Sequence, residues 1–137
     1  MVIVIQDGSD VPVFKQIRNQ IVIGISEGKL SPGEKLPTVR ALAEEIGINS
    51  MTVNKAYQLL KQEGYILTDK RNGVRIRESF FSSGTLSPEA EQLLHQLISE
   101  AHLQGITREE FLEIVDKYYA TLPIQAQSST DFELLTE

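Results

Sequence analysis

The sequence predicts an α+β winged helix-turn-helix domain, followed by a C-terminal α-helical hairpin used for dimerisation. Two short amphipathic patterns flank a tight turn within residues 35–64, and two strand-forming runs flank an Asn-Gly pair within residues 65–77. Two more amphipathic patterns follow a connector. The expected parts of the chain are the winged helix-turn-helix domain 1–78, the dimerisation hairpin 79–123 and a mobile tail 124–137.

The first expected helix spans residues 14–25. Its apolar residues recur at the spacing of one helix face, and Gly28 follows its end. The cluster Ser31-Pro32-Gly33 then predicts a turn, since these residue types favour turn conformations. We expect this helix to complete a winged-helix domain together with the motif that follows.

Residues 35–64 predict the helix-turn-helix itself. Apolar residues recur at i, i+3, i+4 and i+7 on both sides of Gly47, which suits the left-handed conformation that ends a helix. The side chain of Asn49 or Ser50 can cap the second helix. In a DNA-binding motif of this layout the second helix lies in the major groove, whereas the alternative is an ordinary helical hairpin.

Residues 65–68 and 74–77 are expected to form the two strands of a wing. The Asn72-Gly73 pair between them is a strong hairpin signal, because both residues tolerate a positive φ angle. The wing carries basic side chains that suit contact with phosphates or with the minor groove, namely Lys70, Arg71, Arg75 and Arg77. The alternative is a turn whose charges face only solvent.

Residues 87–122 predict two further helices. Ser87 and Pro88 are typical of a helix start, and Thr107 with Glu110 forms a capping box for the second helix. Two short helices cannot bury such apolar faces against each other alone, so we expect a second copy of the chain to cover them in a four-helix dimer. The alternative is a monomer in which the hairpin packs on the winged helix. The residues expected at the dimer interface are Leu93, Leu94, Leu97, Ile98, Phe111, Ile114, Val115 and Tyr118.

The net charge of -6 is divided unevenly along the chain. Residues 1–77 carry 11 Lys and Arg against 8 Asp and Glu, a net charge of +3, while residues 78–137 carry 2 against 11, a net charge of -9. Phosphate binding depends on local positive charge, so the N-terminal part is the one expected to meet DNA. A charge of only +3 implies that helix N-termini and hydroxyls also contribute phosphate contacts.

The composition disfavours several other classes of protein. The chain has no cysteine, and no apolar run approaches the roughly 20 residues needed to span a membrane, so we expect a cytoplasmic protein. No nucleophile elbow or phosphate loop is recognisable, so we expect neither an enzyme nor a cofactor. His95 and His102 lie seven residues apart on one expected helix; solvated or interface histidines are favoured over a metal site, which would need further ligands.

Residues 11–77 resemble the DNA-binding domain of the GntR family of bacterial transcription regulators. The matching segments are PVFKQI (12–17), GKLSPGEKLPTVR (28–40), NKAY (54–57), Leu60 and EG (63–64). The C-terminal part resembles the YtrA subfamily, in which a pair of helices dimerises the protein. The resemblance implies a homodimeric repressor that binds double-stranded DNA and controls a nearby operon, with transport genes as the family expectation. A two-fold dimer further implies an operator with inverted repeats.

Arg40 opens the first helix of the motif, at the position where members of the family contact DNA. An arginine can bind guanine O6 and N7 together, and the alternative for Arg40 is an ion pair with Glu44. Asn54 can pair with adenine, whereas Tyr57 suits either the core or DNA. The full set expected to contact DNA is Arg40, Ser50, Thr52, Asn54, Lys55, Arg71, Asn72, Gly73 and Arg75. The competing function is a winged-helix module that binds another protein through the same surface.

Overall fold

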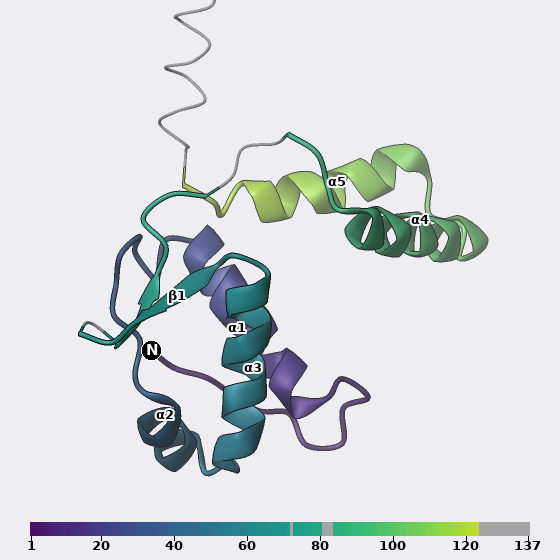
Figure 1. Ribbon diagram of the computed structural model, residues 1–137. Helices are drawn as coiled ribbons and strands as arrows, with labels where there is room; N and C mark the ends of the chain where they lie inside the picture. The colour runs from purple at the N-terminus through teal and green to yellow at the C-terminus, as the bar shows by residue number, and fades with distance from the viewer. Residues whose placement is uncertain (72, 81–83, 124–137) are drawn as a thin grey trace, which may run out of the picture. The chain divides into compact units, whose positions relative to one another are not determined.

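The computed structural model describes residues 1–71, 73–80 and 84–123. The chain divides into two compact units, Met1–Phe80 and Phe81–Glu137 (Figure 1). In the described residues, the first unit has three helices and a two-stranded sheet, and the second has two helices, which confirms the predicted fold class. The bounds are α1 Val13–Ser26, α2 Val39–Ile46, α3 Ser50–Gln62, β1 Ile66–Asp69, β2 Gly73–Ile76, α4 Pro88–Leu103 and α5 Arg108–Tyr119.

Local capping explains where the two helices of the motif begin and end. The Thr38 hydroxyl accepts a hydrogen bond from a main-chain N–H in the first turn of α2, and Gly47 ends this helix with φ = 70°. Asn49 Oδ1 then accepts a hydrogen bond from the Met51 N–H at 2.7 Å. Of the two capping residues that the sequence left open, Asn49 is therefore the cap and Ser50 is the first residue of α3.

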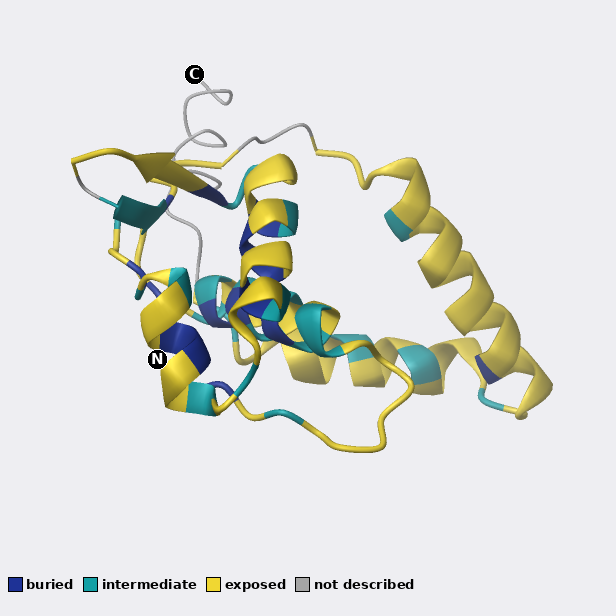
Figure 2. Ribbon diagram, turned by 60° about the horizontal axis from the view of Figure 1, so that its bottom comes forward, coloured by how far each residue is buried: buried dark blue, intermediate teal, exposed yellow. Residues whose placement is uncertain are grey.

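Helix α3 is the central element of the first unit, because α1, α2 and β1 all contact it. Figure 2 shows one face of α3 buried and the opposite face exposed. The most deeply buried large side chains come from all five elements of the unit, namely Ile17, Ile21, Leu42, Val53, Leu60, Ile66 and Ile76. A single hydrophobic core thus orients α3 relative to α2 and to the wing.

The wing is the antiparallel pair of β1 and β2. Ile66 lies opposite Ile76, and at the other end of the ladder Asp69 lies opposite Gly73. Gly73 has φ = 74°, the positive angle that a tight hairpin of this kind requires. Asn72, which we expected at the tip of the wing, lies outside the described residues.

A third short segment, residues 34–36, extends the wing. The Leu36 N–H donates to the Val74 carbonyl at 2.8 Å, and Lys35 lies opposite Arg75 in an isolated antiparallel bridge. No pattern in the sequence predicts this segment, because its ladder is formed with residues far along the chain and leaves no local period. The pairing brings the loop that precedes α2 onto the wing.

The first six residues form another segment that no periodicity predicted. Gln20 Nε2 donates to the Val4 carbonyl at 2.7 Å, and Gln20 Oε1 accepts from the Val4 N–H at 3.0 Å. Gln16 binds the main chain of Gln6 in the same way, at 3.3 and 2.8 Å. Ile3 enters the core beside them. Two glutamines one turn apart on α1 thus take the place of a neighbouring strand.

Tyr57 belongs to the core. Its ring is buried, and its hydroxyl donates to the Pro37 carbonyl at 2.8 Å, which ties the middle of α3 to the loop before α2. Burial raises the pKa of the Tyr57 hydroxyl, and the negative charge of Glu45 raises it further. Of the two roles that the sequence left open for Tyr57, the structure realises the role in the core.

The second unit begins its helices at the expected caps. Ser87 Oγ accepts from the Ala90 N–H at 3.1 Å, and Thr107 and Glu110 form the reciprocal capping box. Figure 2 shows α4 and α5 running apart from the turn that joins them, with almost all of their surface exposed. Within these two helices, Ala101 is the one buried residue.

Among the described residues, no helix is both long and apolar enough to cross a lipid bilayer. The segment that we expected to form a mobile tail, residues 124–137, lies outside the described residues.

Replacing Gln20 by Met keeps the length of the side chain but removes both hydrogen bonds to Val4. Because each such bond contributes roughly 1 kcal/mol and water can replace part of it, we expect the free energy of unfolding to fall by about 1–2 kcal/mol. Gln62→Met, at an exposed position on α3, is the matched control. Urea unfolding compares the two variants. An unchanged midpoint for Gln20→Met would show that the two hydrogen bonds between Gln20 and Val4, here called a glutamine clamp, contribute nothing to stability.

Tyr57→Phe tests the burial of the Tyr57 hydroxyl. The unfolded chain, in which the pKa of tyrosine is about 10, releases this proton at lower pH than the folded chain does. The free energy of unfolding therefore falls as the pH rises above about 10. We expect Tyr57→Phe to be about 1 kcal/mol less stable than the parent at neutral pH, and to lose stability less steeply above pH 10.

Urea titrations at a series of pH values measure both effects. Tyr119→Phe is the control, because the Tyr119 side chain is largely exposed. Parallel pH profiles of the parent and Tyr57→Phe would contradict the assigned environment of this hydroxyl.

Candidate nucleic-acid interface

The exposed face of α3 is the largest part of the candidate interface. Met51, Asn54, Lys55 and Gln58 are all exposed, and their spacing of three or four residues places them on one face of the helix. Asparagine and glutamine amides can each pair with adenine, and an apolar side chain can meet the methyl group of thymine. The sequence analysis did not select Gln58, although its position one turn after Asn54 could have indicated it.

The start of α3 adds a second group of polar side chains. Asn49 uses its side-chain oxygen to cap the helix, so the exposed Ser50 hydroxyl is not needed for capping. Thr52, also predicted to contact DNA, is half-buried. Main-chain N–H groups at a helix N-terminus attract phosphates, and a hydroxyl there can add a further donor.

Lys55 has a structural contact that the sequence did not indicate. Its Nζ lies 4.2 Å from the centroid of the Phe14 ring, which belongs to α1. A cation at this distance from an aromatic ring is attracted by the electrons of the ring face. In this structure Lys55 therefore stabilises the packing of α3 on α1, and a phosphate would have to compete with that contact.

Arg40 stands on the first turn of α2 with its side chain 90% exposed. The ion pair with Glu44 that the sequence left open is present, but its atoms lie 3.8 Å apart and the Glu44 side chain is itself 75% exposed. Such a solvated pair holds the arginine weakly. Arg40, Gly47 and Ser50 line one open depression of about 380 Å³, so the structure brings the predicted contacts from both helices together.

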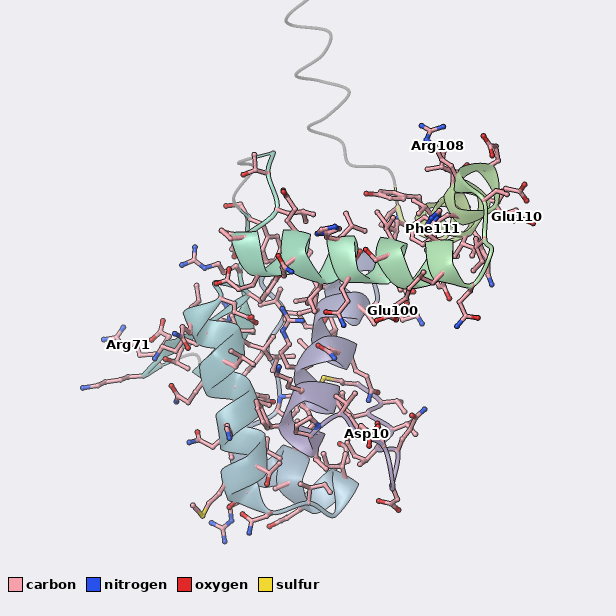
Figure 3. The ribbon with its side chains drawn as sticks, turned by 90° about the vertical axis from the view of Figure 1, so that its right-hand side faces the viewer. Asp10, Arg71, Glu100, Arg108, Glu110 and Phe111 are labelled. Carbon is pink, nitrogen blue, oxygen red and sulfur yellow. The ribbon has the colours of Figure 1, made fainter. Side chains whose placement is uncertain are left out.

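The wing presents Arg71 at its tip. Figure 3 shows the Arg71 side chain pointing away from the body of the first unit. The Arg71 N–H donates to Asp69 Oδ1 at 2.8 Å, which stabilises the turn that carries it, and Lys70 beside it is also exposed. The tip of the wing therefore offers two long cations that can reach beyond the protein surface.

Lys35 and Arg75 form a second basic group at the base of the wing. They lie directly opposite each other across two strands, an arrangement that is unfavourable for like charges. In the part of the chain that the structure describes, neither makes an ion pair, and Arg75 Nε is buried without a hydrogen-bond partner. A bound anion would reduce the repulsion between the two cations. Lys35 was missed because its closeness to Arg75 arises only from the third segment of the sheet.

Both histidines lie on α4 and are exposed. Within the described ranges, no group of three or more metal-binding side chains is close enough together to hold an ion.

Comparison with known sequences places these features in a family. The family described as bacterial regulatory proteins, gntR family, matches residues 14–76. The chain is 37% identical over 115 residues to the HTH-type transcriptional repressor YtrA of Bacillus subtilis, covering 82% of this chain and 88% of that protein. It is 31% identical over 99 residues to the HTH-type transcriptional regulator Rv1152 of Mycobacterium tuberculosis, covering 72% of this chain and 78% of that protein.

Solved structures agree over both units of the chain. A structure described as a transcriptional antiterminator from Listeria monocytogenes matches with a TM-score of 0.78 and 29% identity, over 92% of this chain and 96% of that chain. YtrA from Sulfolobus acidocaldarius, a GntR-family transcription factor, matches with a TM-score of 0.59 and 35% identity, over 75% and 99%. Together with the helix-turn-helix and the wing, these similarities show that the chain belongs to the GntR family of bacterial regulatory proteins, so it is a DNA-binding transcription regulator and not an enzyme.

Proposed function

We propose that the protein is a homodimeric repressor that acts in the cytoplasm on an operator with inverted repeats. The observation that supports DNA binding most strongly is the exposed face of α3. Asn54 and Gln58 lie one turn apart on this face, where both amides could reach base edges, and Arg40 lies beside the start of the helix. The similarity to the repressor YtrA supports the direction of regulation.

The proposed contacts divide by role. Asn54, Gln58 and Arg40 are assigned to base edges, because amide and guanidinium groups distinguish bases in the major groove. The contacts assigned to phosphates or to the minor groove are Ser50, Thr52, Arg71 and the pair Lys35–Arg75. Asn72 and Gly73 are assigned to the tip of the wing, where the main chain would approach the DNA. Lys55 is assigned to a phosphate only if its contact with Phe14 opens.

The proposed homodimer explains the apolar surface of the second unit. Leu93 is 70% exposed and Tyr118 is 63% exposed. Monomeric proteins rarely expose large apolar side chains that adjoin one another on one face. The remaining proposed interface residues are exposed or half-buried, and they are Leu94, Leu97, Ile98, Phe111, Ile114 and Val115. A second copy of the same two helices offers a matching apolar face under two-fold symmetry.

The charge of the second unit supports the assignment of DNA contact to the first unit. Residues 81–137 carry 2 Lys and Arg against 10 Asp and Glu, a net charge of -8, so electrostatic repulsion disfavours contact between α4 or α5 and the DNA backbone. A two-fold dimer would present two copies of α3, and helix-turn-helix dimers of this kind commonly place half-site centres roughly 34 Å apart. The operator is therefore expected to contain two inverted half-sites.

Arg40→Ala tests the proposed base contact. We expect binding to an operator selected from random DNA to weaken by about 1–3 kcal/mol, while binding to unselected duplex changes much less. Glu44→Gln is the matched control, because it removes the ion pair and leaves the arginine. Fluorescence anisotropy titrations measure all three proteins, and equal affinity of the parent and Arg40→Ala for the operator would refute the assignment.

The salt dependence of the same titrations tests DNA binding itself. A protein that binds phosphates loses affinity steeply as salt rises, whereas a module that binds another protein would show no such loss on DNA.

Leu97→Glu tests the dimer. A carboxylate placed in the proposed apolar interface should convert the full-length protein from a dimer to a monomer, because an unpaired charge is costly to bury. Gln92→Glu adds the same group on the opposite face of α4 and should leave the dimer intact. Sedimentation velocity measures the assembly, and footprinting shows whether protection shrinks from two half-sites to one. A dimeric Leu97→Glu protein would place the interface elsewhere.

A further inference from the structure

An aromatic contact holds the last residue of the winged-helix unit. Phe80, the last residue of the first unit, has its ring centroid 6.2 Å from that of Tyr65, with the two planes tilted by 48°. This distance and tilt are favourable for aromatic side chains. The Arg77 N–H also donates to the Tyr65 carbonyl at 3.1 Å, so the segment after β2 is held to Tyr65 at two points.

Tyr65 is itself held by α1. The Arg18 guanidinium carbon lies 5.6 Å from the centroid of the Tyr65 ring, and Arg18 Nε pairs with Glu63 Oε1 at 2.8 Å. Glu63 is the C-cap residue of α3, two residues before Tyr65. Arg18 and Glu63 are mostly shielded from solvent, which makes this the best-protected ion pair among the described residues. These contacts therefore hold the last residues of the first unit against the C-terminal end of α3.

We propose that the stack of Arg18, Tyr65 and Phe80, here called the exit anchor, sets the spacing between operator half-sites that the protein accepts. This inference rests on the proposed homodimer and its inverted-repeat operator. Phe80 acts as a positioning residue: it touches no base, but it decides where the connector to the dimerisation helices begins.

The length of the connector shows why the anchor matters. Six residues, 81–86, separate Phe80 from Ser87, the cap of α4. If Phe80 were released, the Arg77 N–H would still bind the Tyr65 carbonyl, so the free segment would begin after Arg77 and would gain residues 78–80. Three residues extend by at most roughly 11 Å, and two subunits together by roughly 22 Å, which is several base pairs at roughly 3.4 Å each.

An anchored exit therefore restricts the half-sites that both subunits can reach together. When two binding units are linked, the second binds with an effective concentration that depends on how well the linker matches the span. A short connector penalises the wrong span sharply, and a longer one penalises it less. Loss of the anchor should broaden the accepted spacing without changing how each α3 reads its own half-site.

The test uses the full-length protein and Phe80→Ala, chosen because Phe80 is 39% exposed and its removal leaves no deep cavity. The probes are duplexes with two inverted copies of the half-site recovered from random DNA. Their spacer is lengthened one base pair at a time over one helical turn, about 10 bp. Phe80→Tyr, which keeps the ring, and Ser79→Ala, the adjacent exposed position, are the controls.

We expect the parent and both controls to prefer one spacing sharply. For Phe80→Ala, the ratio of affinities between the preferred and the poorest spacing should fall by about tenfold, with affinity for a single half-site unchanged. An unchanged spacing profile for Phe80→Ala, or an equal loss of affinity at every spacing and at the single half-site, would overturn the role of the anchor while leaving the proposed function intact. A parent that shows no spacing preference would overturn the inference alone, whereas a parent that binds as a monomer would overturn the homodimeric function and the inference with it.

Discussion

The first unit depends on the burial of one face of α3. Val53, Tyr57 and Leu60 pack against α1, α2 and the start of the wing, and the opposite face of the helix is left exposed. The same packing orients the proposed reading face, since a rigid core holds Asn54 and Gln58 outward. The Tyr57–Pro37 hydrogen bond adds a polar constraint that ties α3 to the loop carrying Lys35. The proposed reading face and the face that stabilises the core are thus opposite faces of one helix.

The two units satisfy their apolar residues by different means. The first has all of its elements around one core, including the N-terminal segment held by Gln16 and Gln20. The second has well-capped helices whose apolar faces stay exposed, which is the reason for proposing a second copy of the chain as their cover. Dimerisation would then complete a hydrophobic core that one chain cannot close. The exit anchor includes Phe80, the last residue of the first unit, so it lies where the chain passes from the first unit to the second.

The basic residues show which contacts could be predicted from the sequence and which could not. Arg71 and Arg75 were found as members of a local hairpin, because the Asn-Gly signal and the alternation of Val74 to Arg77 both lie within a few residues. Lys35 was not found, since its neighbour Arg75 lies forty positions later and only the third segment of the sheet brings the two together. Lys55 was expected to meet DNA, yet it lies over Phe14 of α1, a contact that no local pattern indicates.

The sequence by itself determined most of the features that depend on residues a few positions apart. Gly47 ended α2, Thr107 and Glu110 capped α5, and the hydrophobic periods located the helices, because caps and turns depend on residues a few positions apart. The GntR resemblance was also readable from local segments. The structure decided two of the alternatives that the sequence left open: Tyr57 lies in the core, and Asn49 is the cap of α3. It alone also decided the glutamine clamps and the exit anchor, because these contacts join residues that become neighbours only when the core closes.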